Sequence, residues 1–393
     1  MPAAGRRRGR GGPGLPGPHA RRLPPSPRAR PRDVGHRRPR RHDPPPGAGV
    51  PVTALLRPAA LAAGDTLAVL TLSSPGPVRY PNAYARGIAN LKAAGFRTVT
   101  TPTTTGRAGW TSGTPRQRAE DLNAAFADPA IGGIVTTIGG NHSAQLLPYL
   151  DWETIAANPK VFCGYSDTTV LHHAIRHMTG MVTFYGPAVI PQWGEHGHPF
   201  PYTTSHFHTV TRSATAPGPV PVSRYLVHED HHTAQAARRA RSTRPAPPRL
   251  ALRPGRAHGP LAPFCPPSMR LLAGTPWQPD LSGHILLLDI SDHAYGPEDF
   301  DADLTHLRQT GLIRDPAAVV MLRTPTGQDA TVYADVLLTH TCGGSYPVLI
   351  GMEGGHVDPM PTYPLGVAAT LDTTTLTITE PAVIPRKDRT DGI

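Results

Sequence analysis

Short apolar runs alternate with helical patterns through the first half of the chain. The run over 66–74 is apolar and β-branched and ends at Ser74-Pro75-Gly76, which predicts a buried strand and then a turn. Strict alternation of this kind indicates a parallel sheet with helices on both faces. The same reasoning predicts strands over 96–101, 131–138 and 161–166, and helices over 82–95, 114–127, 143–150 and 168–178.

A second ordered block starts near Leu271 and contains more strands than helices. An apolar strand is predicted over 285–288 and an amphipathic helix over 297–311. We therefore expect a small β-rich domain in this part of the chain. Its other predicted strands cover 318–322, 348–350, 367–371 and 375–379.

Charge and proline are unevenly distributed, and this changes the domain prediction. Residues 1–50 hold thirteen Arg and two acids, a net charge of 13 − 2 = +11, which equals the formal net charge of all 393 residues. With twelve Pro and no apolar periodicity, this segment cannot bury a core. We predict a disordered basic leader over 1–60 and no nucleic-acid partner, although a basic arm can bind phosphates.

The stretch 201–270 is predicted to be a linker with an anomalous part. Residues 231–270 contain eight Arg, eight Pro and no acid. Two interpretations stay open for this part and for residues 1–50. Each is either a solvated natural segment or out-of-frame translation of a GC-rich gene, which yields the same residue types.

The remaining composition favours a cytoplasmic protein. The basic leader lacks the apolar run of a secretory signal, and the chain has no stretch of 18 apolar residues that would span a membrane. Cys163, Cys265 and Cys342 lie far apart, so neither a disulfide framework nor a zinc site is predicted. We expect no metal and no cofactor: the His228-Glu229-Asp230-His231-His232 cluster lacks metal-site spacing, and 139–143 lacks the P-loop lysine.

The most informative local feature is Ser166, at the junction of an apolar strand and a helix. A serine in such a tight turn presents its hydroxyl above the sheet, although helix capping is the alternative explanation. Its activation requires a base and an orienting acceptor. His356 follows two glycines on a loop, and Asp289 directly follows the strand over 285–288. Asp292 is a weaker candidate for the carboxylate.

Several motifs resemble the LD-carboxypeptidase family of serine peptidases in order and spacing. They cover roughly 61–200 and 270–385. The motifs are Gly64-Asp65-Thr66, the helix from Arg118 to Phe126, Leu146 to Trp152, Asn158-Pro159-Lys160, Gly164 to Asp167, Leu271 to Thr275, Ile285 to Asp289, Thr305 to Gly311, Gly355-His356 and Asp358-Pro359-Met360.

The resemblance implies an α/β fold with a flavodoxin-like parallel-sheet domain over 61–200 and a smaller β-rich domain over 271–385. It makes Ser166 the nucleophile and His356 the base, with Gly140 and the amide of Asp167 as oxyanion donors. Asp289 stands where the family usually has Glu, one methylene longer, so either the backbone compensates or the triad is slack. Asp289→Glu is then expected to be tolerated. A homodimer is also implied.

The substrate implied is a small peptide or peptide conjugate. The family cleaves before the terminal D-alanine of murein tetrapeptides, whereas Phe200-Pro201-Tyr202 resembles the microcin C immunity branch, which cleaves peptidyl-nucleotides. One departure is the stretch 260–267, where the family has a Gly-Gly-Asn turn. The alternative function is therefore a catalytically impaired homologue that binds a small ligand.

Overall fold

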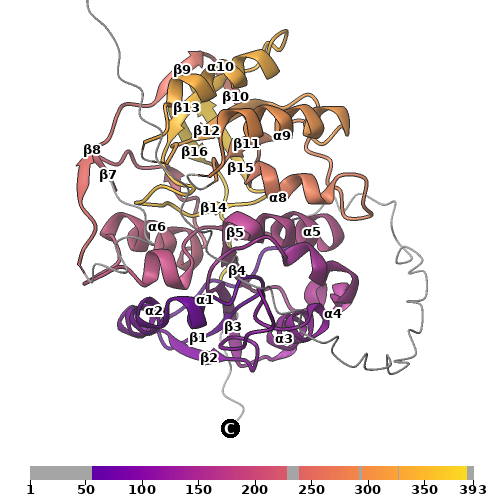
Figure 1. Ribbon diagram of the computed structural model, residues 1–393, viewed down its shortest axis with the longest axis vertical. Helices are drawn as coiled ribbons and strands as arrows, with labels where there is room; N and C mark the ends of the chain where they lie inside the picture. The colour runs from indigo at the N-terminus through magenta and orange to yellow at the C-terminus, as the bar shows by residue number, and fades with distance from the viewer. Residues whose placement is uncertain (1–54, 228–238, 292–293, 326, 387–393) are drawn as a thin grey trace, which may run out of the picture. The chain divides into compact units, whose positions relative to one another are not determined.

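The N-terminal half forms a parallel sheet with strand order 2-1-3-4-5, which is the flavodoxin-like order. The computed structural model describes residues 55–227, 239–291, 294–325 and 327–386 (Figure 1). An antiparallel edge strand, β14, comes from the C-terminal half and pairs with β5. The strands are β1 (Thr66–Leu70), β2 (Arg97–Thr100), β3 (Ile131–Thr136), β4 (Val161–Gly164), β5 (Phe184–Tyr185) and β14 (Tyr363–Pro364).

Helical elements connect these strands, and the sequence predicts those at 81–93, 115–127, 143–149 and 169–179 but not the others. The capping box of Thr114 and Gln117 begins α3, and Gly180, in the left-handed conformation at φ 75°, ends α5. The helical elements of this half are α1 (Gly76–Arg79), α2 (Pro81–Ala93), α3 (Pro115–Ala127), η1 (Ser143–Tyr149), α4 (Trp152–Ala157), η2 (Ser166–Thr168), α5 (Thr169–Thr179), η3 (Val189–Trp193) and α6 (Pro201–Arg212).

The C-terminal half contains an eight-stranded sheet whose centre is parallel. Its order is β6-β16-β15-β10-β11-β12-β13-β9, with parallel pairing from β10 to β13. The prediction of an α/β fold with a second, C-terminal sheet is confirmed. The strands are β6 (Gly218–Pro219), β9 (Leu250–Arg253), β10 (Arg256–Phe264), β11 (Ile285–Leu288), β12 (Ala318–Leu322), β13 (Val348–Met352), β15 (Ala368–Asp372) and β16 (Thr375–Ile378).

Helices accompany this second sheet, and a small β-ribbon lies between β6 and β9 in the chain. In Figure 1, α9 and α10 lie beside the strands of the orange and yellow half. The sequence predicted α9 but missed α10. The elements are α8 (Pro266–Met269), η4 (Arg270–Leu272), α9 (Pro297–Gln309), α10 (Ala330–His340), and the ribbon strands β7 (Tyr225–Val227) and β8 (Thr243–Pro245).

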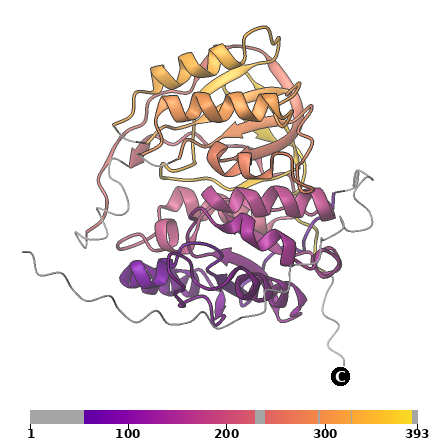
Figure 2. The same ribbon diagram turned by 45° about the vertical axis from the view of Figure 1, so that its right-hand side comes forward.

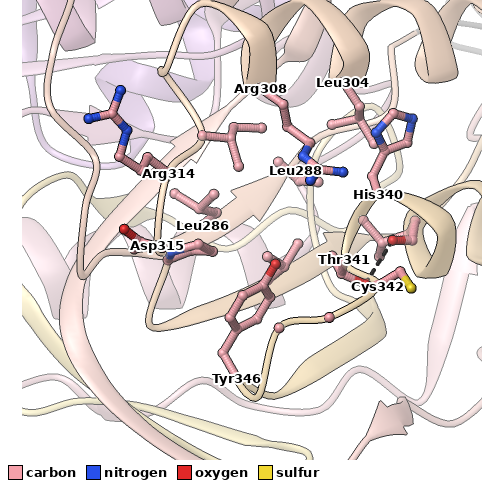
Figure 3. A pocket seen from close by; sticks show the side chains of 16 residues that line it. Leu286, Leu288, Leu304, Arg308, Arg314, Asp315, His340, Thr341, Cys342 and Tyr346 are labelled. Carbon is pink, nitrogen blue, oxygen red and sulfur yellow. Dashed lines mark hydrogen bonds between the residues drawn. The ribbon is translucent and has the colours of Figure 1, made fainter.

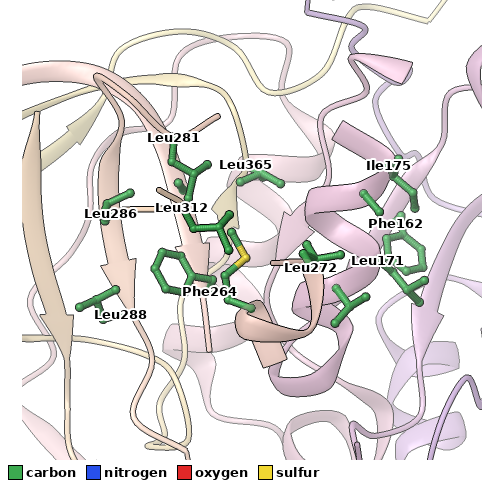
Figure 4. Close-up of a cluster of buried hydrophobic side chains, with 14 of the residues drawn as sticks. Phe162, Leu171, Ile175, Phe264, Leu272, Leu281, Leu286, Leu288, Leu312 and Leu365 are labelled. Carbon is green, nitrogen blue, oxygen red and sulfur yellow. The ribbon is translucent and has the colours of Figure 1, made fainter. Parts of the chain in front are cut away.

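The two halves share a buried core, and α5 lies along their boundary (Figures 1 and 2). His173 on α5 contacts the carbonyl of Pro263 through Nε2 at 3.1 Å, and the N–H of Cys265 donates to Thr169 Oγ1 at 3.0 Å. One apolar cluster joins side chains of β4 and α5 to side chains of β10 and β11 (Figure 4). Burial of this shared surface is the main force that holds the halves together.

The leader was predicted over residues 1–60, and this range extends too far toward the C-terminus. Residues 1–54 lie outside the described residues, but 55–60 are part of the fold. The N–H of Leu56 donates to Gly180 O at 2.9 Å, that of Ala60 donates to Ile384 O at 2.9 Å, and Arg57 pairs with Glu380 at 2.5 Å. Isolated bridges of this kind leave no periodicity, so the sequence pattern could not reveal them.

The linker prediction for 201–270 is wrong for most of that stretch. It contains α6, and residues 250–264 supply strands β9 and β10 of the second sheet. Arg241 and Arg249 are buried against acids elsewhere in the chain. Such specific partners favour a natural segment over out-of-frame translation for 239–270. Residues 228–238 lie outside the described residues. Among the described helices, none is long and apolar enough to cross a membrane.

Candidate active site

Ser166 occupies a strained turn between β4 and α5. Its φ is 61°, in the left-handed region that residues other than glycine rarely adopt. Gly164 makes the turn possible, because a Cβ there would overlap the side chain of Thr136. The N–H of Ser166 donates to Tyr185 Oη at 3.2 Å. This geometry is that of a nucleophile elbow, which lifts a hydroxyl above the carboxyl ends of the strands.

Asp289 directly follows β11 and is fully buried. Its Oδ1 accepts hydrogen bonds from the backbone N–H of His356 at 3.0 Å, and it lies 3.0 Å from His356 Nδ1. Its Oδ2 accepts from the Tyr185 hydroxyl at 2.5 Å. Both carboxylate oxygens are therefore hydrogen-bonded, which is the condition under which a buried carboxylate is tolerated.

His356 connects the other two side chains. Its Nε2 lies 3.0 Å from Ser166 Oγ, while Nδ1 faces Asp289. The shorter Asp is accommodated by the backbone: Gly355 has φ 76°, and a Cβ on it would overlap Asp289 Oδ1. Because Gly355 has no side chain, the loop approaches the carboxylate closely. The 3.0 Å between His356 Nδ1 and Asp289 Oδ1 is therefore a normal hydrogen-bond distance. Asp292, the other carboxylate considered, lies outside the described residues.

Gly139, Gly140 and Asp167 lie beside Ser166 on the side predicted for the oxyanion. A Cβ on Gly139 would be 3.0 Å from Ser166 Oγ and 3.3 Å from the N–H nitrogen of Asp167. The Asp167 carboxylate accepts from the N–H groups of His142 and Ser143, each at 3.0 Å. These bonds fix the glycine turn next to the elbow.

Tyr185 was missed by the sequence analysis, although it bridges Ser166 and Asp289. Burial raises its pKa well above the usual value, and the neighbouring Asp289 charge raises it further, so its hydroxyl keeps its proton. The available signal was its position: it ends β5, the strand that neighbours β4 in the sheet. A residue at this edge faces the same space as the elbow.

One set of possible metal ligands lies within the described residues. Donor atoms of Cys265, Asp289 and His356 lie within 4.8 Å of one another. Burial raises the pKa of the Cys265 thiol well above its usual value, and Asp289 adds to this effect. A metal ion at this place would require the thiolate form of Cys265. The cluster over 228–232 lies outside the described residues.

A cavity of about 240 Å³ opens beside Ser166 and His356. Gly140, Asn141 and the exposed Arg79 also line it. A second cavity, of about 330 Å³, lies at α9, α10, β11 and β12 (Figure 3). Its His340 pairs with Asp301 at 2.6 Å instead of with a nucleophile. The first cavity is therefore the candidate active site.

The sequence is similar to known proteins over most of the described residues. The sequence matches the LD-carboxypeptidase N-terminal domain over residues 67–186 and the LD-carboxypeptidase C-terminal domain over 258–371. A Vibrio cholerae protein with a provisional carboxypeptidase name is 32% identical over 325 residues, 80% of this chain and 94% of that protein. The microcin C7 self-immunity protein MccF of Escherichia coli is 45% identical over 138 residues, 35% of this chain and 40% of MccF.

Solved structures are similar to this chain over most of its length. MccF in complex with aspartyl sulfamoyl adenosine superposes with a TM-score of 0.77 at 29% identity, covering 84% of this chain and 99% of MccF. An MccF-like protein from Bacillus anthracis superposes with a TM-score of 0.77 at 27% identity, covering 83% of this chain and 99% of that protein. The chain belongs to the LD-carboxypeptidase family, a family of peptide hydrolases.

Proposed function

We propose that this protein is a serine-type amide hydrolase that acts through an acyl-enzyme. The observation that carries the proposal is the hydrogen-bonded series Ser166 Oγ, His356 and Asp289, with 3.0 Å at each step. A nucleophile within reach of a base, and a base within reach of a carboxylate, is the arrangement that activates a serine at neutral pH.

In the proposed reaction, Ser166 Oγ attacks the carbonyl carbon of the scissile amide while His356 Nε2 takes the hydroxyl proton. The backbone amides of Gly140 and Asp167 hold the oxyanion. His356 then gives the proton to the departing amine, which leaves an ester on Ser166. A water, deprotonated by the same imidazole, hydrolyses that ester and restores the serine. Asp289 keeps the imidazole in the productive tautomer throughout.

The proposed substrate is a small peptide or a peptidyl-nucleotide. Named relatives support both classes: murein tetrapeptide carboxypeptidase of Pseudomonas aeruginosa is 43% identical over 77 residues, 19% of this chain and 25% of that enzyme. MccF has been solved with aspartyl sulfamoyl adenosine and with glutamyl sulfamoyl guanosine. Arg79, at the cavity rim, offers a cation to a carboxylate or a phosphate. A cytoplasmic location stays a prediction from the composition, and a homodimer stays a prediction from the resemblance.

The test is Ser166→Ala, with turnover measured on a murein tetrapeptide and on aspartyl sulfamoyl adenosine. We expect kcat to fall by about 10³-fold or more, with an unchanged thermal midpoint. Ser205→Ala, at an exposed position of α6, is the matched control and should keep full activity. Retention of half the activity in the Ser166 variant would refute the assignment of the nucleophile.

Pre-steady-state kinetics separates this proposal from ligand binding without chemistry. An acyl-enzyme whose hydrolysis is slow releases one equivalent of amine per Ser166 in a burst, and mass spectrometry detects the ester. A homologue that only binds would give a dissociation constant but no burst. The integration of 239–270 into the fold supports the hydrolase over such an impaired homologue.

A further inference from the structure

The loop that carries His356 has a buried acid at each end. We call residues 353–358 the histidine loop; it begins at Glu353, fully buried, and ends at Asp358, which is 5% exposed. Between them, Gly354 and Gly355 have φ values of 109° and 76° and no side chains that could anchor the loop. The position of the imidazole therefore depends on how firmly the two acids are held, in addition to its own hydrogen bonds to Asp289.

Both acids pair with arginines of residues 231–270, which we call the Arg/Pro-rich segment. Arg241 Nη2 donates to Asp358 Oδ2 at 2.6 Å and also contacts Glu195 Oε2 at 2.6 Å. Arg249 donates to Glu353 Oε2 through Nη2 at 2.5 Å and through Nε at 2.8 Å. Each arginine thus joins one end of the histidine loop to the same nine-residue stretch of chain, residues 241–249.

These pairs are shielded from water, which makes them strong constraints. The side chains of Arg241 and Asp358 are each 5% exposed, and those of Arg249 and Glu353 are 4% and 0% exposed. Burial alone would lower the pKa of Arg241, but the Asp358 and Glu195 charges outweigh it and raise that pKa. Removing one member of a buried pair leaves an uncompensated charge, so the loop would have to move toward water.

The arginines are further fixed by the backbone around them. Arg249 also donates to the carbonyls of Val220 and Thr374, at 3.0 and 3.1 Å. Arg323 contacts Glu353 Oε1 at 3.0 Å and donates to Pro247 O at 3.0 Å, which ties the segment to the loop a second time. The planar guanidinium groups can make these several bonds at once, which an ammonium group cannot.

We propose that Arg241 and Arg249 are positioning residues for catalysis, which clamp the two ends of the histidine loop so that His356 stays within reach of Ser166. This inference rests on the proposed hydrolase function and deepens it. It gives the Arg/Pro-rich segment a role in the reaction, through His356, and not only in holding the sheet together.

The experiment compares Arg241→Lys, Arg241→Gln, Arg249→Lys and Arg249→Gln with Arg253→Lys as the matched control. Arg253 lies in the same segment but donates to the carbonyls of Thr341 and Tyr346, away from the histidine loop. We measure kcat and KM on aspartyl sulfamoyl adenosine, the thermal midpoint, and amide hydrogen exchange over residues 350–360.

We expect kcat to fall by about 10²-fold in the Gln variants, because a displacement of about 1 Å at a catalytic group has this effect. KM should change by less than about twofold, since the substrate cavity keeps its lining, and the Lys variants should recover part of kcat. Exchange over 350–360 should rise in these variants and not in Arg253→Lys. If a Gln variant does not fold, its Lys counterpart decides the question.

Unchanged kcat and unchanged exchange over 350–360 in the folded Arg241 and Arg249 variants would overturn the clamp. An equal loss of kcat in Arg253→Lys would also overturn it, because the effect would then follow from general destabilisation. If the wild-type protein hydrolyses neither substrate, the proposed function fails, whereas the exchange measurements still decide whether the arginines hold the loop.

Discussion

Replacing Asp289 by the longer glutamate should harm this protein, although Glu is the residue that the family resemblance favours. The Asp289 carboxylate already lies 3.0 Å from His356 Nδ1. A further methylene would advance the carboxylate by about 1.5 Å, one carbon–carbon bond. The space ahead is closed, because even a Cβ on Gly355 would overlap Asp289 Oδ1.

The expected loss follows from that displacement. If the histidine loop retreats by about 1 Å, His356 Nε2 moves away from Ser166 Oγ, and kcat falls by about 10²-fold. Asp289→Asn keeps the shape but favours the wrong imidazole tautomer, so its kcat should fall by about 10⁴-fold. The order of activity is therefore wild type, then Asp289→Glu, then Asp289→Asn.

The assay is single-turnover cleavage of aspartyl sulfamoyl adenosine, with a thermal midpoint for each variant. Asp303→Glu is the matched control, because Asp303 is also buried and also accepts from a tyrosine hydroxyl, that of Tyr295 at 2.9 Å. Its kcat should stay within about twofold of wild type. An Asp289→Glu variant as fast as wild type would refute the argument that the Gly355 backbone is matched to the shorter side chain.

Two further predictions concern the glycine turn and pH. Gly139→Ala should lower kcat/KM by about 10²-fold while the protein stays folded, because its Cβ would lie 2.9 Å from Ser166 Cβ; steady-state kinetics with a thermal midpoint checks this. Burial lowers the pKa of His172 to about 4 and that of His173 to about 3. Both pKa values lie below 6.5, so the unfolded chain binds more protons and stability falls as pH drops from about 6.5 toward 4. One such histidine contributes about 2 kcal/mol between pH 7 and pH 5, and His173→Gln should flatten urea-unfolding free energies over this range.

The closeness of Ser166 and Asp289 could be predicted from the sequence because each follows a short strand that is buried along its whole length, VFCG and ILLL. Such strands are easily recognised, and parallel strands place the residues after their carboxyl ends at one edge of the sheet. The polar residue that ends the strand is then the informative one. His356 was harder to choose among twenty histidines, and its two preceding glycines provided the signal.

Strand β10 could not be predicted, because its sequence RAHGPLAPF contains two prolines, which argue against a central strand. The structure explains how it is tolerated. β10 pairs with β15 from Arg256 to Pro260 and with β11 from Leu261 to Phe264, so each part has one paired side. Arg241 and Arg249 could not be predicted either, since their acidic partners in the histidine loop lie more than a hundred positions away in the sequence.

The crossing of the chain between the two sheets explains why the site depends on contacts distant in sequence. After β13 of the second sheet, the chain passes through the histidine loop and then joins the first sheet as β14, where Tyr363 pairs with Tyr185. The Tyr185 hydroxyl in turn accepts from the Ser166 N–H and donates to Asp289. The pairing that brings β14 into the first sheet therefore also places His356 between Ser166 and Asp289. A change that weakens β14 pairing should reduce catalysis before it unfolds either sheet, because the two sheets have separate strand ladders while the site has residues from both.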